Sequence, residues 1–145
     1  FLRMVWAERD APPPALRARA LREDQAPAHA LAAVRRLLER YPGWSAGRLQ
    51  RARLLLRGGD AEEARRCALE LLRDEPEHFD AIVILARTCL TLDAPAQALM
   101  CFDRAVRLNP RLRHDLRDEI REALKALDAE RARRRREQRR QAPLA

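Results

Sequence analysis

The chain has 145 residues, of which 47% are apolar and only 4% aromatic, and its formal net charge is +8. Ala, Leu and Arg dominate, and because these residues lose little entropy in a helix, the composition indicates an all-α fold. The three cysteines lack a Cys-x-x-Cys pair or a histidine at ligand spacing, which excludes a disulfide framework and a structural zinc site. No apolar run reaches the length of a membrane-spanning helix.

Residues 1–10 form an apolar N-terminal segment that contains Phe1, Leu2, Val5 and Trp6. Three interpretations stay open: an extra helical turn packed on the first helices, a segment docked on a partner, or the end of an upstream membrane helix. The Arg-rich, lysine-poor composition is similar to that of proteins from high-GC bacteria. We expect a cytoplasmic protein, with inner-membrane association through sequence upstream of Phe1 as the alternative.

From residue 11 onward the chain repeats with a period of 34 residues. A proline recurs at this spacing, and an alanine lies 12 residues before each proline. Proline ends a helix because it lacks an N–H and forces the preceding residue out of the helical region, whereas alanine lets two helices approach closely. The pattern predicts three helix-turn-helix units, at 11–44, 45–78 and 79–112. The prolines are Pro42, Pro76 and Pro110, and the alanines are Ala30, Ala64 and Ala98.

An apolar stripe follows each of these alanines at positions i+4 and i+7, which is the spacing of one face of a helix. A single helix pair has no partner for that face, so we expect the units to stack and to bury it between them. The stripe residues are Val34, Ala68 and Phe102, followed by Leu37, Leu71 and Ala105.

These positions resemble the pattern of the tetratricopeptide repeat. The match is best over 79–110, and the middle unit adds a Gly-Gly-Asp turn with Asp60 as the helix cap. Arg17 and Arg51 stand where the family usually has a leucine. The resemblance implies a right-handed α-solenoid of about three such hairpins plus a C-terminal capping helix, over residues 11–128. The residues that carry the match are Ile82, Leu85, Ala86, Cys89, Ala98, Phe102, Ala105 and Pro110.

After Pro110 an apolar stripe continues without a second turn signal, which predicts a terminal helix that covers the last unit. The stripe ends at Leu127. Residues 129–145 form an Arg-rich tail with seven Arg and two Glu, where we expect the helix to fray and the chain to become disordered. The stripe residues are Leu112, Leu116, Ile120, Leu124 and Leu127.

An arginine recurs at the same period, eleven residues before each repeat alanine, and Arg121 continues the series on the capping helix. The resemblance implies that this position lines the concave groove in which such proteins hold a partner segment. Guanidinium groups bind carboxylates in two-pronged fashion, so the groove favours an acidic or carboxylate-bearing segment. The alternative is a row of solvated arginines. The predicted groove residues are Arg19, Arg53, Arg87 and Arg121, with Leu49, Leu56, Arg57, Val83 and Leu90 beside them.

The tail offers a second surface, because a run of arginines releases counterions from phosphate and so favours nucleic acid or anionic lipid. A solubilising helix end is the alternative interpretation. The arginines concerned are Arg133, Arg134, Arg135 and Arg136.

No constellation of cysteine, histidine and carboxylate residues predicts a catalytic site, a metal site or a cofactor. Cys67, Cys89 and Cys101 are expected to be small core residues with free thiols. The leading hypothesis is a non-catalytic scaffold or adaptor that binds a protein partner. The alternatives are a structural or assembly subunit of a larger membrane-associated complex, and a protein that contacts nucleic acid or anionic lipid through its tail.

Overall fold

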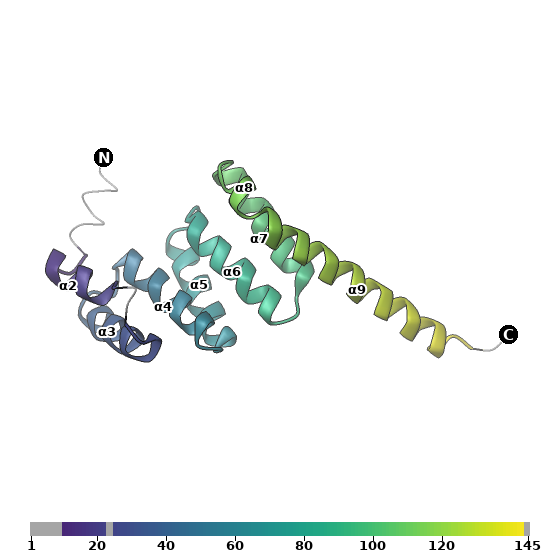
Figure 1. Cartoon of the computed structure of the whole chain (residues 1–145), viewed down its shortest axis with the longest axis horizontal. Coiled ribbons are helices and arrows are strands. Elements are labelled where there is room, and N and C mark those ends of the chain that lie inside the picture. Colours follow the sequence, from purple (N-terminus) through teal and green to yellow (C-terminus); the bar gives the residue numbers. More distant parts are fainter. Residues whose placement is uncertain (1–9, 23–24, 144–145) are drawn as a thin grey trace.

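The computed structural model describes residues 10–22 and 25–143, which Figure 1 shows as a row of helices. The regular structure of this part of the chain is entirely helical, which confirms the predicted all-α class. The apolar N-terminal segment lies outside the described residues except for Asp10. The helices are α2 (Pro14–Ala20), α3 (Pro27–Arg40), α4 (Ser45–Arg57), α5 (Ala61–Asp74), α6 (Phe79–Thr91), α7 (Pro95–Leu108), α8 (Leu112–Asp115) and α9 (Arg117–Gln141).

The helices contact one another mainly in chain order. α3 packs on α4, α4 on α5, α5 on α6 and α6 on α7, while α9 packs on α7 and α4 also touches α6. Three helix pairs therefore follow one another along the row, α2 with α3, α4 with α5, and α6 with α7 (Figure 1). The pairs coincide with the three helix-turn-helix units that the period predicts.

The helix ends follow the repeated prolines. α3, α5 and α7 end at Arg40, Asp74 and Leu108, each two residues before a proline of the period. α2 has only 7 residues, against 13 in both α4 and α6. Its late start follows from the prolines at its beginning, since a proline disfavours the helical conformation in the residue before it.

Apolar side chains are buried in three clusters along the row rather than in one central core. The repeat alanines are 3%, 0% and 0% exposed, as expected where helices approach closely. The last cluster surrounds Phe102 and includes Leu116 and Ala123 from the C-terminal part of the chain. The other two contain Leu71 and Val34. The C-terminal part of the chain thus packs on the last pair through Leu116 and Ala123, whereas Leu124 of the predicted stripe is 50% exposed.

Two helices begin at residues whose side chains accept a backbone hydrogen bond. The cap predicted at Asp60 is confirmed, because its Oδ1 accepts from the N–H of Glu63 at 3.2 Å. Gly59 in the same turn has a φ of 89°, in the left-handed region that glycine adopts at no steric cost. His78 starts α6 in the same way, its Nδ1 accepting from the N–H of Ala81 at 3.2 Å, which the sequence had not indicated.

The C-terminal helix differs from the prediction in two respects. A short α8 precedes it, so the chain bends at the buried Leu116 instead of forming one helix from Pro110. α9 then continues unbroken to Gln141, where fraying and disorder were expected from residue 129 onward. Ala, Arg, Glu and Gln are strong helix formers, and the i,i+4 pair of Glu130 with Arg134 at 2.7 Å adds local support. Burial of an apolar stripe is therefore not required for this helix.

Candidate functional site

A hollow of about 540 Å³ lies where α4 and α6 adjoin the first helix pair, and it is rich in arginine. Leu56 from α4 is half-buried there, Leu54 and Ile84 lie behind it as buried core residues, and Gln25 and Gln50 add amide groups. We call it the arginine hollow and define it by Arg22, Arg53, Arg57 and Arg87 with Leu56 and Ile84.

Four predicted groove residues meet in the arginine hollow: Arg53, Leu56, Arg57 and Arg87. They come together because α4 and α6 are neighbours in space and the period of 34 puts Arg53 and Arg87 at the same height and rotation on the two helices. The register argument therefore identified these positions correctly as neighbours.

The other predicted groove residues lie elsewhere. Leu49 and Val83, which share one register, are only 8% and 6% exposed and belong to the core clusters. Leu90 is half-buried against the last cluster, outside the hollow. Arg19 on α2 and Arg121 on α9 are exposed and do not line it either. Of the apolar residues that line the hollow, Leu56 was predicted and is half-buried, whereas Leu54 and Ile84 are core residues.

The arginines of the hollow differ in their partners. Arg53 and Arg57 are exposed and make no ion pair with any residue that the structure describes. Arg87 is bound in two-pronged fashion by Glu119 of α9: its Nε and Nη2 donate to the two carboxylate oxygens, both at 2.7 Å. These hydrogen bonds raise the pKa of the Arg87 guanidinium above its ordinary value. Two of the predicted arginines are thus open to a ligand, and a third already holds a carboxylate.

No protein-family model matches the sequence, and a comparison with curated proteins finds none that is similar to it. The resemblance to the tetratricopeptide repeat therefore stays a prediction from the spacing of its residues. The function of the chain has to be argued from the chemistry of its surfaces.

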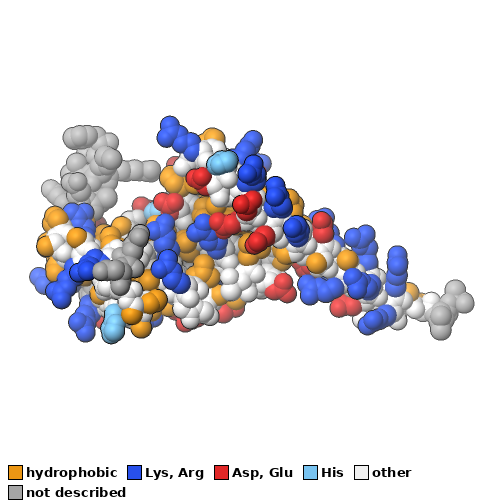
Figure 2. All heavy atoms as spheres, in the orientation of Figure 1, with side chains coloured by type: hydrophobic (Ala, Val, Ile, Leu, Met, Phe, Trp, Pro, Cys, Tyr) orange, Lys and Arg blue, Asp and Glu red, His pale blue; other side chains and the backbone are white. Residues whose placement is uncertain are grey.

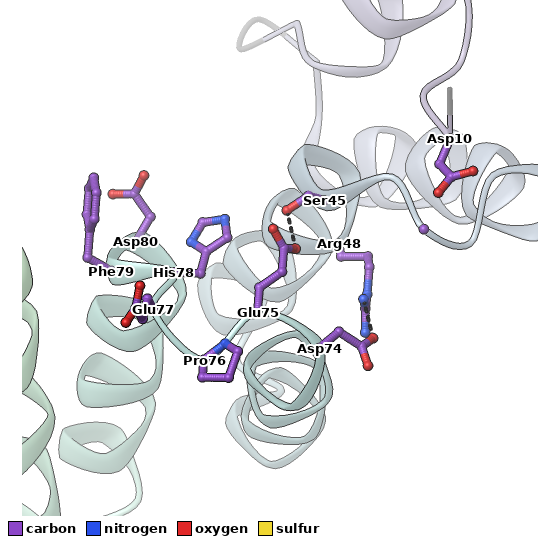
Figure 3. Close-up of a pocket in the computed structure, with 11 residues that line it drawn as sticks. Asp10, Ser45, Arg48, Asp74, Glu75, Pro76, Glu77, His78, Phe79 and Asp80 are labelled. Carbon is purple, nitrogen blue, oxygen red and sulfur yellow. Dashed lines mark hydrogen bonds and ion pairs between the residues drawn. The ribbon is translucent and has the colours of Figure 1, made fainter. Parts of the chain in front are cut away.

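A second hollow, of about 870 Å³, lies beside the turn between α5 and α6, and five acidic side chains are among the residues that line it (Figure 3). Two of its carboxylates are already engaged: Arg48 donates to Asp74 at 2.7 Å, and the hydroxyl of Ser45 donates to Glu75 at 2.7 Å. The hollow also adjoins the N-terminal ends of α4 and α6, where negative charge is favourable. Among the described residues no group of three or more His, Cys, Asp or Glu side chains is placed to hold a metal ion. These carboxylates are accounted for by helix-end electrostatics.

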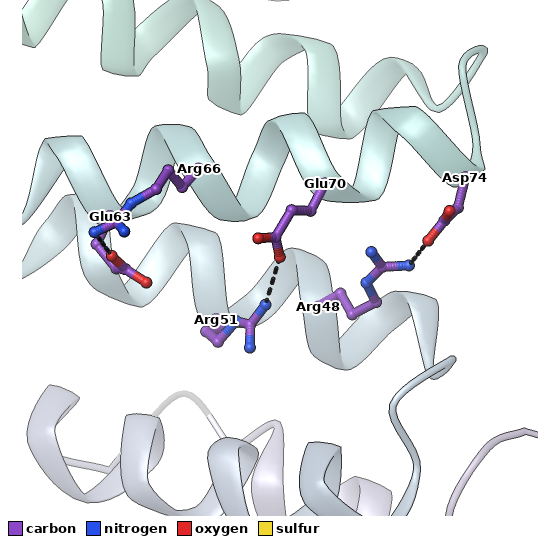
Figure 4. A network of polar contacts seen from close by, with 6 residues as sticks. All are labelled: Arg48, Arg51, Glu63, Arg66, Glu70 and Asp74. Carbon is purple, nitrogen blue, oxygen red and sulfur yellow. Dashed lines mark hydrogen bonds and ion pairs between the residues drawn. The ribbon is translucent and has the colours of Figure 1, made fainter.

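Arg51, at a position where the resemblance predicts a leucine, lies between α4 and α5 (Figure 4). The side chain of Arg51 is 25% exposed, and its Nη2 lies 3.8 Å from a carboxylate oxygen of Glu70 on α5. Its Nε is buried without a hydrogen-bond partner. Arg48 pairs with Asp74 on the same seam, and Arg66 pairs with Glu63 within α5. This network joins the helices of one pair and leaves no open cation for a ligand.

The cysteines are largely buried, as predicted, with free thiols at Cys67 and Cys89 in the core and Cys101 half-buried. One contact was missed. The thiols of Cys89 on α6 and Cys101 on α7 share a hydrogen bond, which lowers the pKa of Cys89 to about 7 and raises that of Cys101. Only the pairing of α6 with α7 brings these residues together, and their separation of 12 positions corresponds to no sequence motif.

The basic end of α9 is a separate surface. Figure 2 shows Lys and Arg side chains gathered on the part of α9 that extends beyond the helix pairs. Two of the predicted tail residues have acidic neighbours, since Arg134 pairs with Glu130 at 2.7 Å and Arg133 lies 4.0 Å from Asp93. Arg135 and Arg136 are exposed. None of the described helices combines the length and the apolar character needed to cross a membrane.

Proposed function

We propose that this chain is a non-catalytic protein-interaction scaffold, in which the three helix pairs and α9 form a right-handed solenoid of the tetratricopeptide type. The partner is an acidic segment held in the arginine hollow. The observation that carries this proposal is the placement of two exposed arginines, Arg53 and Arg57, beside the half-buried Leu56 and without a carboxylate partner among the residues that the structure describes. The coincidence of the period of 34 with the helix pairs supports the solenoid.

The chemistry of the hollow favours a segment in which acidic and apolar side chains alternate. A guanidinium group presents its donors in a planar fork that fits a carboxylate, and such charge-assisted hydrogen bonds are stronger than neutral ones. The half-buried Leu56 offers apolar surface to a neighbouring Leu or Val of the partner. Because the arginines are exposed to solvent, binding is expected to weaken as the salt concentration rises.

The basic end of α9 is the second candidate surface, favoured by the exposed Arg135 and Arg136. It suits a phosphate-bearing partner, which is a different class from an acidic peptide. The two surfaces can be separated by mutation, since the arginine hollow contains none of the tail residues.

The direct test is binding of a fluorescein-labelled peptide that alternates Glu and Leu, followed by fluorescence anisotropy at low salt. The variant carries Arg53→Glu and Arg57→Glu in the full chain. We expect it to lose about tenfold in affinity or more, because two exposed ion pairs of up to about 1 kcal/mol each are lost and replaced by repulsion. The peptide with Gln in place of Glu should bind wild type weakly.

The matched control carries Arg35→Glu and Arg36→Glu, two exposed arginines on α3 outside the hollow. It makes the same change in net charge and should alter the affinity by less than twofold. Equal losses in both variants would show that the peptide responds only to net charge, and the hollow would then not be the binding site. Circular dichroism checks that both variants keep their helix content.

A further inference from the structure

Arg87 takes part in two features of the molecule at once. It lines the arginine hollow, and it is also held by Glu119 from the capping helix through two hydrogen bonds of 2.7 Å. The pair is partly exposed, with side-chain exposures of 41% for Arg87 and 32% for Glu119. Solvent and a ligand in the hollow can therefore both reach it.

The period explains why, among the residues that the structure describes, Arg87 has a carboxylate partner and Arg53 has none. Glu119 lies 32 residues after Arg87, and the same step from Arg53 leads to Leu85 on α6. Leucine has no carboxylate, so Arg53 is left without one. The contrast between an open Arg53 and an occupied Arg87 follows from this single difference in side chain.

We propose that Glu119 acts as an internal competitor for the partner, occupying at Arg87 the carboxylate position that an acidic ligand would take. This inference rests on the proposed function of the arginine hollow. A ligand with one carboxylate binds at Arg53 and Arg57 and leaves the Arg87–Glu119 pair intact. A ligand with a second carboxylate in reach of Arg87 displaces Glu119, so occupation of the hollow is coupled to α9.

The spacing of the helices specifies the ligand further. Packed neighbouring helices lie about 8–10 Å apart, which sets the separation of equivalent positions on α4 and α6. An extended segment in the polyproline II conformation rises about 3.1 Å per residue with three residues per turn, so residues i and i+3 lie on one side about 9 Å apart. The preferred partner segment therefore carries acidic residues at i and i+3, with an apolar residue between them over Leu56.

The strength of this competition is limited. An ion pair exposed to this extent changes an equilibrium constant by about fivefold at most. Glu119 therefore weakens binding of the ligand's second carboxylate without preventing it. The competition also distinguishes ligands by their number of carboxylates, since the affinity of a ligand with a single carboxylate does not rise when Glu119 is removed.

The experiment compares Glu119→Gln with the control Glu122→Gln, which removes the same charge from an exposed position on the same helix. The probes are two labelled peptides, one with Glu at i and i+3 and one with Glu at i and Gln at i+3. We expect Glu119→Gln to tighten binding of the first peptide by about two- to fivefold and to leave the second unchanged. Glu122→Gln should leave both affinities unchanged within error.

Weaker binding in Glu119→Gln would mean that Glu119 positions Arg87 for the ligand, and equal effects of the two variants would mean that only net charge matters. Either result would overturn the proposal that Glu119 competes with the ligand for Arg87. If wild type binds neither peptide, or binding ignores the Arg53/Arg57 reversal, the proposed function itself fails. If binding depends on Arg53 and Arg57 while Glu119→Gln has no effect, the hollow stands and only the competition fails.

A measurement on wild type removes any dependence on the folding of the variant. The Nε–H signal of Arg87 in a nitrogen-15 NMR spectrum reports its hydrogen bond to Glu119. It should shift on addition of the peptide with two Glu residues and stay in place with the single-Glu peptide. An unchanged signal in the presence of saturating two-Glu peptide would contradict displacement.

Discussion

Replacement of Gly47 by alanine tests the packing of the first helix pair against α4. Gly47 lies buried inside α4, where glycine is normally unfavourable by about 1 kcal/mol relative to alanine. In an exposed helix the substitution would therefore stabilise the protein. Here a Cβ would come within 2.1 Å of Cε3 of Trp44, far inside contact distance. The ring of Trp44 has to move if the variant is to fold.

The sign of the change in the free energy of unfolding depends on two opposing contributions, the cost of overpacking and the gain in helix propensity. Trp44 is 3% exposed and packs in the cluster with Val34 and Leu38, so its ring has little room to shift. Overpacking of this kind costs about 1–3 kcal/mol, which exceeds the gain of about 1 kcal/mol in helix propensity. We expect Gly47→Ala to lower the free energy of unfolding by about 1 kcal/mol. For a chain of this size the midpoint of thermal unfolding should fall by about 2–4 °C.

The assay is urea unfolding followed by circular dichroism at 222 nm, made as a cycle with Trp44→Leu. In the Trp44→Leu background the obstructing ring is absent, so adding Gly47→Ala should raise the free energy of unfolding by up to about 1 kcal/mol. A change of sign between the two backgrounds is the expected signature. A stabilising effect of Gly47→Ala in the wild-type background would refute the placement of the ring over Gly47.

Two further predictions concern the core and the helix caps. Phe102→Ala removes the largest fully buried side chain and should cost about 3–5 kcal/mol in the free energy of unfolding, whereas Met100→Ala, at a residue 73% exposed on the same helix, should change it by less than about 0.5 kcal/mol. Similar losses in urea unfolding would contradict the assigned faces of α7. Asp60→Ala should cost about 1 kcal/mol, because the N–H of Glu63 loses its acceptor, while Glu62→Ala at the exposed neighbouring position should have a smaller effect.

The helix pairs could be predicted from the sequence because their signals are local and chemical. A proline ends a helix whatever its surroundings, so Pro42, Pro76 and Pro110 correctly indicated where α3, α5 and α7 end. Asp60 could be identified as a cap for the same reason. The prediction of fraying and disorder in the tail was wrong. It inferred disorder from the absence of an apolar stripe, whereas α9 extends to Gln141 through residues of high helix propensity.

The candidate site was only partly predictable. The period predicted that Arg53 and Arg87 lie side by side, and both line the arginine hollow, but it could not tell a groove leucine from a core leucine, because α4 and α6 bury more than one face. Leu49 and Val83 were assigned to the wrong side for this reason. Glu119 is one carboxylate among several on a highly charged helix, and nothing local distinguishes it. Its role depends on the packing of α9 against α7, which only the structure provides.

The 32-residue step that separates Arg87 from Glu119 also bears on how freely the units of this chain could be duplicated or exchanged. From Arg19 the step leads to Arg51, from Arg53 to Leu85, and from Arg87 to Glu119. The three positions that share one register are thus followed by a like charge, an apolar side chain and an opposite charge. Units that share a period of 34 are therefore not equivalent modules. Placing the first unit between the third unit and α9 would set Arg17, which shares the register of Glu119, opposite Arg87, so the order of the units is part of the information that the chain carries.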